Sequence, residues 1–157
     1  MKVLEKFSGN YLDAEIIAVD KKELTRAQLK RFEFDWRKEF DYELYKLILC
    51  GSKKILGLMS LVIISNELRI EIRLLESSKE NVGNGKEYDR IAGCMIAFAC
   101  RLSFKYGFDG FVSLIPKTNL IEYYMSKYNL SKMGRHLVTE GDNSQRLIME
   151  YIENSII

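Results

Sequence analysis

The chain has 157 residues, of which 47% are hydrophobic and 29% are charged, and its formal net charge is +2. This length and composition predict one soluble domain, residues 1–157, with a substantial core, and so small a net charge argues against nucleic acid as a partner. The longest apolar run, Ile55 to Ile64, is too short to span a membrane and fits a buried strand.

Cysteine and histidine are too few and too scattered for metal or nucleophile chemistry. Cys50, Cys94 and Cys100 have no Cys-x-x-Cys spacing, and His136 is the only histidine. We therefore expect no metal site and no Ser-His-Asp triad. Cys94 and Cys100 are expected to be buried, inert thiols. The odd cysteine count and the lack of a signal sequence predict a cytoplasmic protein.

The first part of the chain predicts a strand and then a helix. Residues 14–19 are rich in β-branched side chains and predict a short strand. Thr25 is a candidate N-cap for the helix, with Gln28 three residues on as in a capping box. The basic residues of segment 21–38 alternate with acids, which is typical of a solvated helix face. Apolar side chains at helical spacing predict a buried stripe along this helix: Leu29, Phe32, Trp36 and Phe40.

Three strands are predicted next. Residues 42–50 and 55–64 are joined by a hairpin signal at 51–54. A turn at Asn66 leads into residues 68–75, where apolar and charged side chains alternate. Such alternation predicts one face on the core and one face on solvent or a polar cleft.

The second half of the chain alternates helices with strands. Residues 90–106 carry an apolar stripe and predict a long amphipathic helix that Gly107 closes. Residues 111–115 should form a strand parallel to its predecessor, because a helix separates the two. The remaining predicted elements are a helix at 119–128, a strand at 135–139 and a closing helix from Asp142. This order predicts an α/β fold with a mixed central sheet of about six strands flanked by helices.

A polar loop with Gly83 and Gly85 links strand 68–75 to helix 90–106. Backbone N–H groups at a helix start lack internal partners and carry partial positive charge. Strand, loop and helix start together therefore predict a cradle for a phosphorylated cofactor. The Gly-Asn-Gly sequence is not a dinucleotide fingerprint, because it lacks the third glycine.

This order of elements over residues 42–139 resembles the GNAT superfamily of acetyl-CoA-dependent N-acetyltransferases. Two local features add to the resemblance: Ile55-Leu56-Gly57 resembles the start of the family's third strand, and Tyr124 lies where many members carry a tyrosine. The chain also resembles a group of short bacterial GNAT-like proteins with runs like Ile96 to Cys100 and Gly107 to Gly110.

The family signature, Q/R-x-x-G-x-G/A, falls on Glu87 to Ala92. Ala92 fits the last position, whereas Glu87 replaces Gln or Arg and Arg90 replaces the first glycine. Arg90 either places its guanidinium on a phosphate or blocks the cradle, and we favour the contact.

The resemblance implies acetyl-CoA as cosubstrate, with its pyrophosphate on the loop and helix start. It also implies that the thioester carbonyl accepts a hydrogen bond from backbone N–H of residues 74–77. The residues expected to bind the cofactor are Leu75, Ser77, Tyr88, Asp89, Arg90, Ile91, Ala92 and Gly93.

Acetyl transfer to an amine needs a deprotonated amine, a polarised thioester carbonyl and a proton for the departing thiolate. Tyr124 is the candidate general acid, and Glu71 and Glu76 are the candidate bases. The alternative roles are a packed tyrosine for Tyr124 and, for Glu71, an ion pair with Arg69 or Arg73.

The sequence therefore favours an N-acetyltransferase that transfers acetyl directly from acetyl-CoA to an amine. The amine acceptor, a small molecule or a protein, is not identified by any motif. The alternative is a non-catalytic GNAT-fold binding module for CoA or for a protein partner. We expect no nucleic-acid, membrane or metal partner. The sequence is compatible with a homodimer.

Overall fold

One nine-stranded mixed sheet organises the part of the chain that the structure, a computed structural model, describes. These are residues 1–153, with Thr118 described by its backbone only. The strand order is β6-β1-β2-β3-β4-β5-β7-β9-β8. The strands are β1 (Lys2–Glu5), β2 (Tyr11–Ala18), β3 (Glu43–Leu49), β4 (Ile55–Ile64), β5 (Arg69–Ser77), β6 (Tyr88–Asp89), β7 (Val112–Leu114), β8 (Ser131–Met133) and β9 (His136–Thr139).

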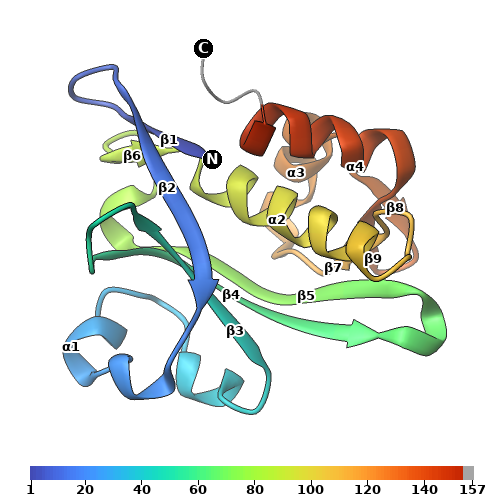
Figure 1. Cartoon of the computed structure of the whole chain (residues 1–157), viewed down its shortest axis with the longest axis horizontal. Helices are drawn as coiled ribbons and strands as arrows, with labels where there is room; N and C mark the ends of the chain where they lie inside the picture. The colour runs from blue at the N-terminus through green and yellow to red at the C-terminus, as the bar shows by residue number, and fades with distance from the viewer. Residues whose placement is uncertain (154–157) are drawn as a thin grey trace.

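Four α-helices cover the two faces of this sheet (Figure 1). They are α1 (Arg26–Leu29), α2 (Ile91–Lys105), α3 (Ile121–Tyr128) and α4 (Gly141–Ile148), and a π turn (Met149–Glu153) extends the last helix. Short 3-10 turns lie at Lys21–Glu23, Trp36–Glu39, Ser65–Glu67, Lys79–Asn81 and Thr118–Leu120. No helix within residues 1–153 is long and apolar enough to cross a membrane.

The α/β class is confirmed, but the sheet has nine strands rather than about six. The additional strands β1, β6 and β8 contain two to four residues each. Runs this short show no side-chain alternation, so their sequence carries little strand signal. They form because other strands supply partners: Leu4 of β1 pairs with Tyr11 of β2 and with Asp89 of β6, and Met133 of β8 pairs with His136 of β9.

The long helix expected after Thr25 is wrong, although its N-cap is confirmed. The Thr25 hydroxyl accepts a hydrogen bond from the Gln28 N–H at 3.3 Å, and α1 then ends at Leu29. Two residues of the expected stripe, Phe32 and Trp36, are nevertheless buried. The backbone that follows α1 is not helical, because its N–H groups donate to the Glu76 carboxylate of β5, as described below.

The sheet separates two hydrophobic cores. The larger core lies between the sheet and α2, where Met95, Ile96 and Cys100 are fully buried. The smaller core lies on the opposite face, where the α1 segment places Phe32 and Trp36 against the sheet. Full burial of a large apolar side chain stabilises a fold by about 1.5–3 kcal/mol, so Trp36 fastens a segment that has little helix of its own.

The sheet splits between β5 and β7. The two strands run parallel, as predicted, but pair only from Ile70 to Ile72 on β5. Beyond this point β5 continues to Ser77 alongside β4 alone, while β7 ends at Leu114. A shift in the β4–β5 register leaves Arg73 unpaired at the point where the split begins. The result is an opening in the sheet that is reachable from both faces.

Candidate functional site

A cavity of about 570 Å³ occupies this split. The α1 side contributes Glu33 and Phe34 to its lining, and the α2 side contributes Tyr124 and Tyr128. Most of the predicted site residues also line it: Leu75, Glu76, Ser77, Tyr88, Asp89, Arg90, Ile91 and Ala92. The cavity therefore passes between the two layers of the molecule and joins the predicted cofactor loop to the opposite face.

The open edge of β5 presents two backbone amides to the cavity. The N–H of Ser78 bonds to the carbonyl of Leu56 at 2.9 Å, which fixes the β4–β5 ladder in this region. Backbone groups of an antiparallel strand alternate between its two edges. The N–H groups of Leu75 and Ser77 therefore point away from β4, toward the side where β7 has departed. They are placed to donate hydrogen bonds to a carbonyl in the cavity.

Further amides lie at the start of α2, where Ile91 and Ala92 line the other end of the cavity. The first intrahelical bond runs from Cys94 N to Arg90 O at 2.9 Å, so the amides of Ile91, Ala92 and Gly93 have no partner within the helix. Arg90 has a φ of 78°, the left-handed conformation that glycine adopts at least cost. This is the position at which the family signature has its first glycine.

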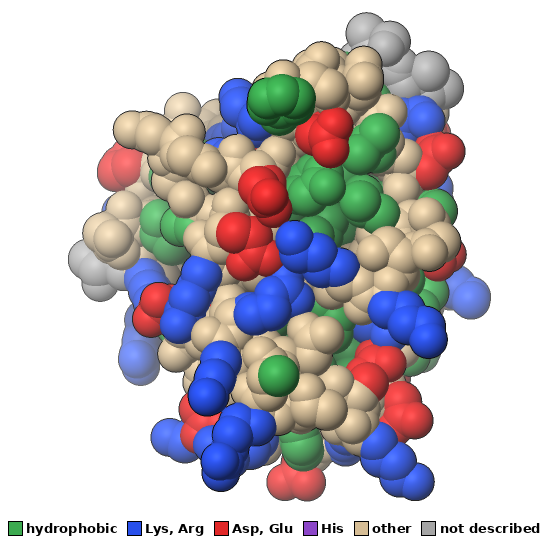
Figure 2. All heavy atoms as spheres, turned by 90° about the vertical axis from the view of Figure 1, so that its left-hand side faces the viewer, with side chains coloured by type: hydrophobic (Ala, Val, Ile, Leu, Met, Phe, Trp, Pro, Cys, Tyr) green, Lys and Arg blue, Asp and Glu red, His purple; other side chains and the backbone are tan. Residues whose placement is uncertain are grey.

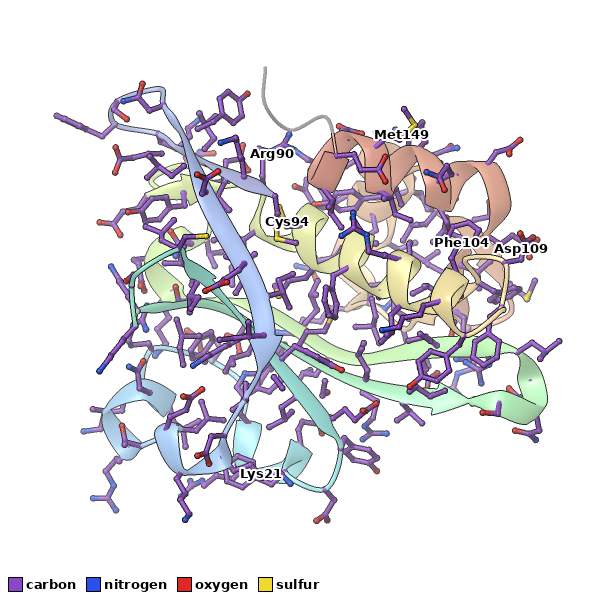
Figure 3. The ribbon with its side chains drawn as sticks, viewed as in Figure 1. Lys21, Arg90, Cys94, Phe104, Asp109 and Met149 are labelled. Atoms are coloured by element: carbon purple, nitrogen blue, oxygen red, sulfur yellow. The ribbon has the colours of Figure 1, made fainter. Side chains whose placement is uncertain are left out.

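The Arg90 side chain turns toward the two ends of the described chain. Its Nε donates to the Lys2 carbonyl at 3.2 Å and one terminal nitrogen to the Glu150 carbonyl at 2.8 Å. Its guanidinium also lies 4.7 Å from the centre of the Tyr151 ring. Figure 3 shows Arg90 at the start of α2, with Cys94 one turn further on. The side chain is thus engaged in joining β1, α2 and the last turn.

Asp89 places an anion inside the predicted cradle. Its Oδ1 accepts the Arg90 N–H at 2.8 Å and the Lys86 ammonium at 3.3 Å. Partial burial raises the pKa of this carboxyl, but the Arg90 amide and Lys86 outweigh that effect and hold the pKa below its ordinary value. The loop is also fixed by Asn81, a buried residue absent from the sequence prediction, whose Oδ1 accepts the Tyr88 N–H at 3.0 Å.

Gly93 has a packing role. It does not line the cavity, and a Cβ at this position would lie 2.3 Å from the Tyr151 ring. The small residue lets α2 approach the turn after α4 closely.

Tyr124 lines the cavity from α3 and is largely buried. Burial, with a smaller contribution from Tyr123, raises the pKa of Tyr124 to about 12. Its ring centre lies 5.6 Å from that of Tyr128, within a cluster of tyrosines between α3 and the last turn. The phenol therefore keeps its proton throughout the physiological pH range.

The Glu76 carboxylate anchors the loop after α1. It accepts hydrogen bonds from the N–H groups of Glu33 (2.5 Å) and Phe34 (3.2 Å) and from the Trp36 indole (2.8 Å). These three bonds occupy both oxygens and replace the helical bonds that residues 33–36 would otherwise make. They are the physical reason for the break in the expected helix.

Glu71 lies outside the cavity lining. Its Oε1 is 2.8 Å from His136 Nε2 and 3.2 Å from an Arg69 nitrogen. Burial raises the pKa of this carboxyl, but the His136 and Arg69 bonds prevail and lower it. Glu71 thus forms the ion pair with Arg69 that the sequence offered as its alternative role.

The buried thiols follow the prediction. Cys94 and Cys100 are fully buried, and burial raises the pKa of each thiol to about 12, which keeps them protonated and unreactive. Among residues 1–153, no group of three or more His, Cys, Asp and Glu side chains is arranged to hold a metal ion.

Charge is dispersed on the side of the molecule that carries β6 and α1. Figure 2 shows lysine and arginine side chains over much of this face, with aspartate and glutamate among them. The ion pairs Lys54–Glu87 and Arg31–Glu80 lie around the loop before α2.

Comparison with solved structures identifies the fold. The chain is similar to the N-acetyltransferase YlbP of Bacillus subtilis in complex with coenzyme A (16% identity, TM-score 0.57, covering 83% of this chain and 97% of that one). It is also similar to the toxin AtaT bound to acetyl-CoA and the antitoxin AtaR C-terminus (11% identity, TM-score 0.59, covering 87% of this chain and 99% of that one). A third similar structure is the spermidine/spermine N-acetyltransferase SpeG of Vibrio cholerae (12% identity, TM-score 0.59, covering 91% of this chain and 98% of that one).

These matches show that the chain has the GNAT acetyltransferase fold. No family model matches the sequence, and no curated protein matches it significantly.

Proposed function

We propose that this protein is an acyltransferase that transfers acetyl directly from acetyl-CoA to an amine. The observation that carries the proposal is the cavity through the split sheet. It offers a cofactor and an acceptor separate entrances, from the α2 side and the α1 side, and a common meeting point beside β5.

The cofactor is proposed to enter from the start of α2. The free amides of Ile91, Ala92 and Gly93 lie at a helix N-terminus, which favours a phosphate group. The loop at Tyr88 to Arg90 then supplies backbone shape rather than positive charge, because Asp89 carries a negative charge and the Arg90 guanidinium is hydrogen-bonded to backbone carbonyls. The thioester carbonyl would accept a hydrogen bond from the amide of Leu75 or Ser77.

In the proposed reaction the amine nitrogen attacks the thioester carbon, a C–N bond forms and the C–S bond breaks. Donors on the β5 edge stabilise the charge that develops on the carbonyl oxygen. Tyr124 gives its proton to the departing thiolate, and the proton released by the new amide restores the phenol. Neither Glu76 nor Glu71 is used as the base, because the first is fully hydrogen-bonded and the second lies outside the cavity.

Cofactor binding is the decisive test. A ligand at a hundred times its Kd stabilises the folded state by about 2.7 kcal/mol, so saturating CoA should raise the melting temperature measurably. Isothermal calorimetry should show one site per chain. The same protein should then release free CoA from acetyl-CoA when mixed amines are added. Absence of heat and of a melting shift at millimolar CoA would reject the proposal.

The second candidate is a GNAT-fold module that binds CoA or a protein without turnover. The observation in its favour is that both predicted base carboxylates are engaged and that an ionised Asp89 lies in the cradle. The two candidates differ in one measurement. CoA binding without transfer to any amine, and without hydrolysis of acetyl-CoA, identifies the module.

A further inference from the structure

The α1-side mouth of the cavity is defined by a contact between two loops. Phe34 follows α1, and Lys117 follows β7 at the far side of the split; both line the cavity. The Lys117 ammonium lies 4.1 Å from the centre of the Phe34 ring. Phe34 is itself held by its backbone N–H, which donates to Glu76 at 3.2 Å. The ring that Lys117 contacts therefore belongs to a residue held by the same carboxylate that shapes the loop.

Lys117 differs from the other cations of the cavity in what it contacts. Arg73 is bonded to Glu39 at 3.1 Å, and Lys86 to Asp89 at 3.3 Å. Arg90 donates to two backbone carbonyls. Within the described part of the chain, Lys117 has the Phe34 ring as its contact and forms no ion pair. An ammonium on an aromatic face still has donors free for a hydrogen-bond acceptor.

The carboxylates of the cavity do not neutralise this charge. Glu76 accepts three hydrogen bonds from the α1 loop, and Asp89 is taken up by Lys86 and the Arg90 amide. The Glu33 side chain is 72% exposed, and its carboxylate lies 4.0 Å from Lys79. The α1-side mouth thus carries one positive charge, that of Lys117, which favours a ligand with an anionic group at this entrance.

We propose that the acceptor is a small amine that also carries a carboxylate, as amino acids do, and that Lys117 binds this carboxylate. The inference rests on the proposed function, because it concerns the acceptor entrance of the same site. A carboxylate matches the single charge of Lys117, and its binding at the mouth would direct the amine inward, toward the β5 edge. Lys117 then determines specificity without taking part in bond making.

The test compares each amino acid with its carboxamide. Alanine, leucine and phenylalanine are offered beside alaninamide, leucinamide and phenylalaninamide, each pair at equal concentration of free-base amine. The wild-type protein should favour the acid by about tenfold in kcat/KM, the scale of a hydrogen bond to a charged group. Lys117→Gln should remove this preference by lowering kcat/KM for the acids and leaving the amides unchanged. Lys117→Glu should reverse it.

The matched control is Lys132→Gln, which removes a lysine from β8, outside the cavity lining. This variant should keep the wild-type preference, and all three variants should bind CoA with wild-type affinity. Equal rates for acids and amides, no transfer to either, or a Lys117→Gln variant that loses CoA affinity would each overturn the acceptor assignment. Absence of CoA binding by the wild-type protein would instead overturn the proposed function, so the two failures are distinguishable.

Discussion

At the scale of single residues, Arg90 shows how an arginine is accommodated at the position where the signature of the GNAT superfamily, which the chain resembles, has its first glycine. Its backbone adopts the left-handed conformation, with a φ of 78°, that the signature glycine would adopt without strain. The side chain offsets the strain through hydrogen bonds to Lys2 and Glu150 and through contact with the Tyr151 ring. The sequence raised a phosphate contact for Arg90, which stays a prediction; in the structure two nitrogens of its guanidinium donate to backbone carbonyls.

Replacing Arg90 should separate these two contributions. Arg90→Ala keeps the left-handed strain and loses both anchors, so the free energy of unfolding should fall by about 1–3 kcal/mol. Arg90→Gly loses the anchors but relieves about 1 kcal/mol of strain, and should be the more stable of the two variants. Urea unfolding of both proteins measures the difference. Should Arg90→Ala prove the more stable, the strain argument would be wrong.

Tyr124 is the residue on which the proposed chemistry depends. Tyr124→Phe keeps the buried ring and removes the proton donor, so turnover should fall by roughly ten- to a thousandfold while the Kd for CoA stays constant. Because burial raises the pKa of Tyr124 to about 12, its ionisation should cause no loss of activity between pH 7 and pH 10. Steady-state kinetics and calorimetry on both proteins check this, and unchanged turnover would remove Tyr124 from the mechanism.

Asp89 predicts how stability depends on pH. Its pKa is lower in the folded protein than in the unfolded chain, so its contribution to stability is complete above the unfolded value of about 3.9 and is lost as the pH falls through the folded value. Asp89→Asn should therefore make the unfolding free energy fall less steeply below about pH 4. Urea unfolding between pH 7 and pH 2.5 measures both slopes. Identical slopes would contradict the assigned interaction with Arg90 and Lys86.

At the scale of elements, the α2 helix can pack closely against the turn after α4 because Gly93 has no side chain. Gly93 admits the Tyr151 ring against the helix backbone, and a Cβ there would come within 2.3 Å of it. Gly93→Ala should lower the free energy of unfolding by about 1–3 kcal/mol through overpacking. Gly85→Ala is the control, because a Cβ at that position meets no atom within 4 Å.

A second substitution tests the cause. Tyr151→Leu removes the ring that the new methyl group would strike, so it should recover part of the loss in the Gly93→Ala background. Thermal melts of the two single variants and the double variant give the coupling energy. Strict additivity would show that Gly93 acts through something other than Tyr151.

At the scale of the whole molecule, the split sheet makes one cavity accessible from two faces. If CoA binds as proposed, hydrogen exchange should slow at the Leu75 and Ser77 amides and at the first amides of α2. The amides of β9, which pairs with β7 and β8 outside the split, should be unaffected. Protection confined to other regions would place CoA elsewhere. Mass-spectrometric exchange with and without saturating CoA measures this.

The sequence by itself determined the order of the larger elements and much of the core. The periods of the strands at 55–64 and 68–75 and of the helix at 90–106 are local properties, and the structure places these elements at Ile55–Ile64, Arg69–Ser77 and Ile91–Lys105. The parallel pairing across α2 followed from connectivity alone. The predicted cofactor loop and Tyr124, which was named from the family resemblance, line one cavity.

Only the tertiary structure decided which charges remain available in the cavity. Glu76 meets Trp36, Glu71 meets His136 and Arg90 meets Lys2, partners that lie 40, 65 and 88 residues apart in the chain. The charge of Lys117 stands out because two other cations of the cavity have found distant partners, Arg73 in Glu39 and Arg90 in Lys2 and Glu150, while Lys86 pairs with nearby Asp89. Contacts at this separation depend on how the sheet and helices pack, and no local period of the sequence encodes them.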